Sequence, residues 1–155
     1  MRKIVNQIRN LDLIEKELNS NMIGVLALNV DEDKVVQTTT TYIYLDKNIY
    51  IFFGEKDELY NSIKFRTDVN FTILKTEKTK KSPKADFTPT YHIFSISISG
   101  LLKEVDDQKT IDDLRKNYLE KYSSRQEERE RNPAKLSRVV LIDSREIQAI
   151  EEIGG

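Results

Sequence analysis

A run of polar side chains fills the centre of one expected strand. In Gln37-Thr38-Thr39-Thr40-Thr41-Tyr42, strand alternation places Gln37, Thr39 and Thr41 on the same face. An amide and two hydroxyl groups in a row could form hydrogen bonds with the polar edge of a flat ring. A strand that simply faces solvent gives the same pattern, because threonine is a good strand former. Both interpretations stay open on residue types alone.

A second candidate lies where an expected strand at 49–53 passes into an expected helix. Phe53, Gly54 and Lys56 occupy this junction, and the free N–H groups of a helix N-terminus can bind phosphate. The residues around Lys56 are acidic: Glu55, Asp57 and Glu58. Carboxylates there oppose an anion and favour the start of a helix, so a helix capped by its own acidic residues is the competing interpretation.

The single histidine, His92, lies on the same face of an expected strand as Phe94, Ile96 and Ile98. A histidine in such surroundings is more often structural than catalytic. One histidine excludes a multi-histidine metal cage, and the absence of cysteine excludes disulfides, thiolate metal sites and a cysteine nucleophile. The sequence contains no phosphate-binding loop, zinc motif, nucleophile elbow or calcium loop. No metal site and no catalytic residue are predicted.

Composition narrows the class of protein. The chain has 155 residues, which is the size of one domain, and 25 basic against 26 acidic residues give a net charge of −1. Near-neutral charge argues against a nucleic-acid-binding protein. The longest apolar runs fall far short of the ~18 residues that a membrane span needs, and no signal peptide is evident. We therefore expect a cytoplasmic protein that does not bind membranes.

Hydrophobic periodicity predicts the elements that position these residues. The expected order along the chain is an N-terminal helical segment at 1–20, strands at 22–30, 35–45 and 49–53, a helix at 54–66, a strand at 69–74, a mobile loop at 76–90, a strand at 91–105, a helix at 110–122, a charged linker at 123–135 and one bent strand or two at 139–150. Short turns between strands imply antiparallel pairing. A small single-domain barrel with helices outside would remove exposed sheet edges.

Several segments, in this order, resemble a known family. They are Glu15-Lys16-Glu17-Leu18 leading into Ile23-Gly24-Val25-Leu26-Ala27, then Ile49-Tyr50-Ile51-Phe52-Phe53-Gly54, Leu59-Tyr60-Asn61-Ser62-Ile63-Lys64, Asp68-Val69-Asn70-Phe71 and Ser97-Ile98-Ser99-Gly100. The pattern resembles the FMN-binding split barrels, which are the pyridoxamine 5′-phosphate oxidase-like proteins, and in particular their small stress-protein-like branch. The resemblance implies a mainly β fold, a six-stranded antiparallel split barrel with flanking helices. It also implies a homodimer that holds FMN in a cleft between its subunits.

The resemblance also implies which residues hold the cofactor. Three would line the cleft (Gln37, Thr39 and Thr41), and three would lie near the phosphate (Phe53, Gly54 and Lys56). The basic residues that hold the phosphate in the family fall on Gln37 and Tyr42 in the second strand. At the helix start, the family's serine, arginine and lysine fall on Asp57, Glu58 and Leu59. Only Lys56 matches a family cation, so we expect weaker FMN binding than in the family.

Three functions follow as hypotheses. The first is an FMN-binding flavoprotein, an oxidoreductase of unknown substrate in which the flavin carries the redox chemistry. The second is a relative that has lost FMN and binds haem or another flat ligand, for which His92 would matter more. The third is a non-catalytic dimeric binding protein. The family oxidase's substrate-binding residues cannot be placed in this sequence, so vitamin B6 oxidation is not expected.

Overall fold

The computed structural model describes residues 2–77, 86–123 and 137–155. Eight strands and three helices occur in these ranges, in the order β1 (Lys3–Ile8), α1 (Leu11–Ser20), β2 (Ile23–Asp31), β3 (Lys34–Thr41), β4 (Ile43–Leu45), β5 (Asn48–Gly54), α2 (Glu58–Ser62), β6 (Asp68–Glu77), β7 (Tyr91–Val105), α3 (Gln108–Tyr122) and β8 (Ser137–Gly154). The predicted mainly β fold is confirmed. The predicted number of six strands is wrong.

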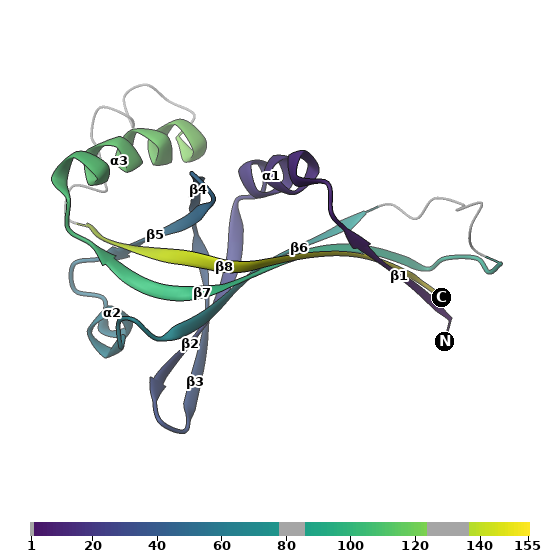
Figure 1. The fold of residues 1–155 in the computed structure, drawn as a ribbon, viewed down its shortest axis with the longest axis horizontal. Coiled ribbons are helices and arrows are strands. Elements are labelled where there is room, and N and C mark those ends of the chain that lie inside the picture. Colours follow the sequence, from purple (N-terminus) through teal and green to yellow (C-terminus); the bar gives the residue numbers. More distant parts are fainter. Residues whose placement is uncertain (1, 78–85, 124–136) are drawn as a thin grey trace.

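The strands form one curled antiparallel sheet in the order β3-β2-β6-β7-β8-β5-β4, and β1 pairs with β8. In Figure 1, α1 and α3 lie above the long strands β7 and β8, and the β2–β3 hairpin projects below them. Curling lets the inner faces of the strands pack against one another and against α1 and α2, whereas α3 packs on the opposite face of β5 and β8.

The extra strands have two separate origins. Residues Lys3–Ile8 form β1 and not the predicted helix, because they pair along β8 from Lys3 opposite Gly154 to Ile8 opposite Ala149. Ile4 and Ile8 are four residues apart, a spacing that suits one face of a strand as well as a helix. Only the later part of the N-terminal segment is helical, from Leu11, where the Asn10 side chain accepts a hydrogen bond from the Leu13 N–H at 3.2 Å.

Tyr42 accounts for the second difference. The strand expected at 35–45 is divided into β3 and β4 because the Tyr42 N–H donates to the Tyr122 hydroxyl at 3.0 Å and not to a neighbouring strand. The Tyr42 hydroxyl in turn donates to the Leu18 carbonyl oxygen at 2.6 Å, inside the core. The side chain is completely buried, so this residue ties the sheet to both α1 and α3.

Other predicted boundaries shift or fall outside the described residues. The helix expected at 54–66 is the short α2, which begins at Glu58. Of the loop expected at 76–90, residues 76–77 end β6, residues 86–90 contain neither helix nor strand, and residues 78–85 lie outside the described residues. Of the linker expected at 123–135, Ser123 caps α3 and the remainder lies outside them too.

The core follows the inner faces of the strands. Its completely buried members include Leu18, Leu26, Ile49, Ile51, Phe71, Ile98, Leu102 and Ile142. A second, smaller cluster joins Ile43, Tyr50 and Val139 of the sheet to Leu114 of α3. Burial of this apolar area is the main favourable contribution to folding. No helix in the described part of the chain is long and apolar enough to cross a membrane.

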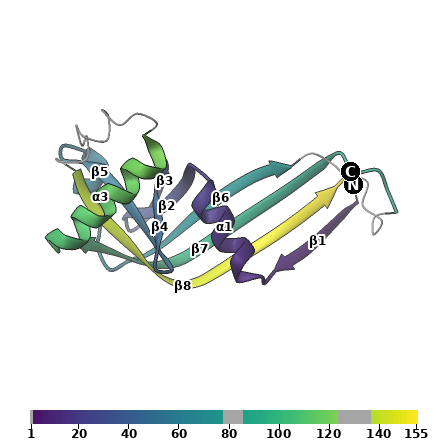
Figure 2. The ribbon, with the colours of Figure 1, turned by 90° about the horizontal axis from the view of Figure 1, so that it is seen from above.

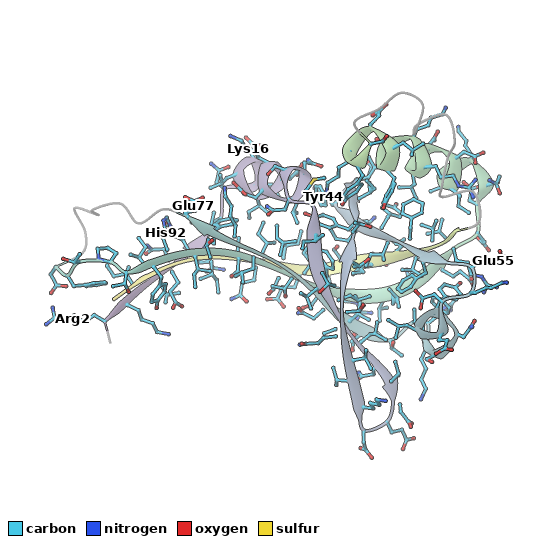
Figure 3. All side chains as sticks on the ribbon, turned by 180° about the vertical axis from the view of Figure 1, so that it is seen from behind. Arg2, Lys16, Tyr44, Glu55, Glu77 and His92 are labelled. Carbon is cyan, nitrogen blue, oxygen red and sulfur yellow. The ribbon has the colours of Figure 1, made fainter. Side chains whose placement is uncertain are left out.

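Beyond the curled region, β6, β7, β8 and β1 extend together as an arm (Figure 2). Both termini lie at its tip, where Arg2 and Gly155 exchange backbone hydrogen bonds of 2.9 and 3.0 Å. The arm carries His92, so this histidine lies at the opposite end of the molecule from Glu55 near α2 (Figure 3).

Candidate functional site

The strands β3, β2, β6, β7 and β8 align their outward side chains in rows across the sheet. One row runs through Gln37, Ala27, Asn70, Ser99 and Glu146. The next row runs through Thr39, Val25, Thr72, Ser97 and Gln148. Small and polar residues dominate both rows, whereas the intervening residues point into the core. We call this surface the outer face.

A groove crosses the outer face as two adjoining hollows that share Ala27 and Asn70. The first hollow has a volume of about 380 Å³ and is lined by Ile23, Gly24, Val25, Ala27, Gln37, Thr39, Asn70, Thr72 and Leu74. The second has a volume of about 460 Å³ and continues toward Asp68, Gly100 and Arg145. Volumes of this size are typical of small-molecule sites. We call the two hollows together the outer-face groove.

Hydrogen bonds hold the polar floor of the groove in place. The Asn70 side chain is central, since its Nδ2 donates to Ser99 Oγ at 3.1 Å and its Oδ1 accepts from Thr72 Oγ1 at 3.0 Å. The Thr72 hydroxyl also lies 3.2 Å from that of Ser97. Gln37 and Thr39, on the neighbouring strand, have no side-chain hydrogen-bond partner within the described residues. Their polar groups can therefore bind a ligand.

Exposed apolar side chains surround this polar floor. Ile23, Val35 and Leu74 are 57%, 64% and 63% exposed, and Val25 is 38% exposed. All four line the groove, and together they form an apolar patch on one face of the sheet that indicates a binding surface. The groove thus combines apolar walls with a polar floor, a composition that suits a flat ring with a polar edge.

The structure divides the residues predicted from the sequence into three places. Gln37 and Thr39 both line the first hollow of the groove, and their role in ligand binding stays a prediction. Thr41 lies at its α3 end, where its hydroxyl is 3.2 Å from that of Tyr118 and lines neither hollow. Phe53, Gly54 and Lys56 line neither hollow either. Gln37 and Thr39 are exposed, so the interpretation of the threonine segment as a solvent-facing strand stays open beside that of a ligand site.

Comparison with solved structures identifies relatives of this architecture. A candidate pyridoxamine 5′-phosphate oxidase of Corynebacterium glutamicum aligns with a TM-score of 0.69 at 19% identity, covering 100% of this chain and 98% of its own. A candidate 5-nitroimidazole antibiotic resistance protein of Bacteroides thetaiotaomicron aligns with a TM-score of 0.76 at 11% identity. This alignment covers 100% of this chain and 93% of that protein. The FAD-binding protein of Mycobacterium smegmatis aligns with a TM-score of 0.64 at 11% identity, over 96% of this chain and 99% of that protein. No protein-family model and no curated protein matches the sequence.

The chain has the split-barrel fold. The resemblance inferred from the order of sequence segments is thus confirmed at the level of the fold, over the whole chain. At sequence identities of 11–19%, structural similarity shows a shared fold and does not show a shared function.

In this split barrel, the junction between β5 and α2 does not fit a phosphate group. The Asp57 carboxylate already accepts the Leu59 N–H at 2.9 Å, and so occupies the start of α2 that an anion would need. Phe53 is 5% exposed and packs on Tyr60 with ring centroids 5.8 Å apart, so it belongs to the core. Gly54 and Lys56 are exposed, and Lys56 remains among acidic neighbours.

Beside this junction lies a polar cluster that sequence reasoning missed. The Tyr60 hydroxyl donates to Glu104 at 2.5 Å, and the Arg138 guanidinium lies 4.8 Å from the Tyr60 ring centre. Burial and the hydrogen bond to Glu104 raise the pKa of Tyr60 above its ordinary value. Arg138 of β8 lies opposite Phe53 of β5 in the sheet, and this pairing brings the guanidinium to Tyr60. The pairing of β5 with β8 cannot be read from the sequence. Because Arg138 and Glu104 both contact Tyr60 and carry opposite charges, this cluster offers an anion little net attraction.

The α3 end of the outer face is closed by aromatic residues. Tyr118 packs between Phe52 and Tyr122, with ring centroids 5.0 and 4.6 Å apart. Lys121 lies with its Nζ 3.9 Å from the centre of the Tyr42 ring and donates to the Tyr42 carbonyl oxygen at 3.3 Å. Burial lowers the pKa of Lys121 from 10.5 to about 8. Aromatic side chains therefore cover part of Lys121 at this end of the sheet.

His92 takes part in an ionic cluster on the arm and not in the groove. Its Nε2 lies 2.7 Å from Glu151 Oε1, and its Nδ1 lies 4.0 Å from Glu77 Oε2. Lys75 links Glu77 to Glu17 of α1 through contacts of 3.1 and 3.2 Å. No cluster that could hold a metal ion occurs among the described residues. The structural interpretation of His92 agrees with these contacts.

Several groove residues carried a signal that the sequence analysis did not use. Asn70 and Thr72 alternate with the buried Phe71 and Ile73, as Ser97 and Ser99 alternate with Ile96 and Ile98. Polar residues at every second position of two expected strands could have indicated a second binding strand beside Gln37 and Thr39. Sequence alone does not show that β6 neighbours β2, which brings Asn70 beside Ala27.

Proposed function

We propose that this split barrel binds a flavin, with the isoalloxazine ring lying in the first hollow of the outer-face groove. The observation that carries this proposal is the composition of the hollow. Ile23, Val25 and Leu74 offer apolar contact to a flat ring, whereas Gln37 and Thr39 offer unpartnered polar groups to its edge. The shared fold with the FAD-binding protein of Mycobacterium smegmatis supports the same ligand class. The finer proposal, from the family resemblance, is that the flavin is FMN.

The proposal includes a second copy of the chain. The apolar patch around the groove leaves four large side chains exposed in one subunit (Ile23, Val25, Val35 and Leu74). Pairing of two outer faces would bury these side chains and close the groove over the ring. A homodimer with the ligand between its subunits is the arrangement that the resemblance implies, and the position of the patch supports it.

When bound, the flavin supplies hydride and single-electron chemistry. The residues of the chain would bind and orient the ring. The Gln37 amide can both donate to and accept from a ring edge, and the Thr39 hydroxyl can do the same. Val25 and Ala27 would exclude water from the face of the ring against the sheet. Asn70 is held by Thr72 and Ser99, so the floor stays in one orientation when the ring binds.

Flavin binding is compatible with two functions, which differ in whether the bound flavin is reduced and reoxidised in a catalytic cycle. An oxidoreductase of unknown substrate is the first. A non-catalytic dimeric binding protein is the second, and one observation favours it: none of the nine residues that line the first hollow has a side chain that titrates between acidic and neutral pH. Substrate protonation would then have to come from the flavin itself or from solvent.

Binding of riboflavin and FMN to the purified protein, followed by quenching of flavin fluorescence, tests the proposal. Val25→Glu places a charge in the groove and should weaken both flavins at least about tenfold, because the ring would contact a carboxylate. Leu11→Glu is the matched control. It adds the same charge at the first turn of α1, where a carboxylate is tolerated, and should leave affinity unchanged.

The outcomes separate the parts of the proposal. A wild-type protein that quenches neither flavin contradicts the flavin function. Equal quenching by wild type and Val25→Glu contradicts the groove as the site. Sedimentation velocity should show a dimer for wild type and for Leu11→Glu, and a shift toward monomer for Val25→Glu; a monomeric wild-type protein contradicts the dimer. A steady-state assay with NADH or NADPH, following oxidation of the bound flavin's electron donor, distinguishes the oxidoreductase from the binding protein.

A further inference from the structure

We infer that the outer-face groove recognises the flavin through its ring alone, so that riboflavin and FMN bind with about equal affinity. This inference rests on the proposed flavin site and adds the class of ligand that the site selects. It follows from the distribution of charge around the groove and at the β5–α2 junction, both of which are unfavourable to a phosphate dianion.

The groove itself attracts no anion. The first hollow is lined by nine residues, none of which carries a charge. The second contains Asp68, Arg145 and Glu146, which together have a net charge of −1. Arg145 is also shared, since its Nη1 lies 3.7 Å from Asp68 Oδ1. A phosphate that entered this hollow would meet two carboxylates and one cation that is already paired. Coulomb repulsion would offset any contact with Arg145.

The charged residues next to the groove are mostly acidic or paired. The β2–β3 turn, beyond the second hollow, contains Asp31, Glu32, Asp33 and Lys34, a net charge of −2. Lys75 follows Leu74, but strand alternation turns its side chain to the opposite face of the sheet, where it contacts Glu17 of α1 at 3.2 Å and Glu77 at 3.1 Å. The hydrogen bonds to these two carboxylates raise the pKa of Lys75. In the turn and around Lys75, acidic groups therefore outnumber the cation.

The β5–α2 junction does not replace the missing cations. The four consecutive residues Glu55, Lys56, Asp57 and Glu58 have a net charge of −2. Two of the backbone N–H groups at this junction are already used, because Leu59 donates to Asp57 Oδ1 and the Asp57 N–H donates to the Gly54 carbonyl oxygen. In contrast, the ring needs only the neutral groups of Gln37 and Thr39. The neutral groove and the acidic junction thus favour recognition without the phosphate.

The ratio of the two dissociation constants tests this inference. Riboflavin and FMN share one ring and differ by the phosphate, so the ratio isolates its contribution. We expect the dissociation constants to agree within about threefold at low ionic strength, and salt to leave the ratio unchanged. Tenfold tighter binding of FMN, lost in high salt, overturns the inference while leaving the flavin function intact. Failure of both ligands to bind would instead contradict the proposed function.

A substitution that introduces a cation provides the positive control. Gln37→Arg places a guanidinium in the first hollow and should favour FMN over riboflavin about tenfold, because a charge-assisted contact with the phosphate becomes available. Gln148→Arg is the matched control, since Gln148 is exposed on the same outer face but lines neither hollow. Its ratio should stay that of wild type. A Gln37→Arg protein that is folded by circular dichroism, yet keeps the wild-type ratio, contradicts the charge argument.

Discussion

The two faces of the same strands differ sharply in what they contain. On the inner faces of β2, β6 and β7, Leu26, Phe71 and Ile98 are completely buried. On the outer faces, Ala27, Asn70 and Ser99 lie half-buried in a row across the same strands. The inner face can change little without opening a cavity, because interiors are close-packed. The outer face can change its polar groups without loss of fold, which explains how a split barrel can keep its architecture while its ligand site diverges.

Neighbouring residues of β6 offer the largest test of this comparison. Phe71→Ala should lower the free energy of unfolding by about 3–5 kcal/mol. The Phe71 ring is completely buried, and its centroid lies 4.9 Å from that of the Tyr42 ring. Thr72→Ala, one residue further on the outer face, should lower it by about 1 kcal/mol or less, because it removes two half-buried hydrogen bonds. Urea denaturation of both variants gives the two values. Similar losses in both would show that the faces do not divide the roles as proposed.

The groove can also be compared with the β5–α2 junction. The family resemblance predicts that one flavin site uses both, with three residues on the strand at 35–45 and three at the junction. Of the six predicted residues, Gln37 and Thr39 meet in the groove, whereas Lys56 stays in solvent beside acidic neighbours and Phe53 joins the core. Strand alternation could predict the outward face of β3, since it depends only on local geometry. The acidic composition of the junction also predicted a helix capped by its own acidic residues, and the hydrogen bond that Asp57 accepts from Leu59 N–H agrees with this interpretation.

An Asp57 substitution sharpens this second comparison. Asp57→Ala removes the N-cap of α2 and should lower the free energy of unfolding by about 1 kcal/mol. It should leave riboflavin affinity unchanged, because the junction lines neither hollow of the groove. Thermal or urea unfolding measures the first effect, and fluorescence quenching measures the second. Asp57→Asn, which keeps a capping side chain without the charge, should retain most of the stability. Loss of riboflavin binding in Asp57→Ala would place the ligand at the junction after all.

Sequence periodicity predicted the fold class, the antiparallel pairing, the positions of α3 and β7 and the helical second half of the N-terminal segment, because each has a strong local pattern. It failed where a distant partner decides the local structure. Ile4 and Ile8 fit a helix until β8 pairs with them, and Tyr42 interrupts a strand because of a hydroxyl 80 residues away on α3. The groove needed the same kind of information, since it depends on β6 lying beside β2. Neither contact can be inferred from periodicity.

The smallest expected effect concerns the closed end of the outer face. Burial lowers the pKa of Lys121 from 10.5 to about 8, so between these values the unfolded chain binds more protons than the folded chain. Stability should therefore rise with pH from about pH 8, by on the order of 1 kcal/mol or less because the side chain is only half-buried. The rise can be measured only up to about pH 10. Above that pH the unfolded chain loses its tyrosine protons while Tyr42 and Tyr122, whose pKa values are raised by burial, keep theirs in the folded chain, so stability falls again.

Urea unfolding of wild type, Lys121→Met and Lys116→Met across this range measures the effect. Lys121→Met should abolish the rise, whereas Lys116→Met, an exposed lysine of the same helix, should keep it. Equal slopes in all three proteins would mean that water reaches the Lys121 ammonium group in the folded state. A rise that only Lys121→Met loses would instead show that the packing of Lys121 on the Tyr42 ring keeps this group partly out of water.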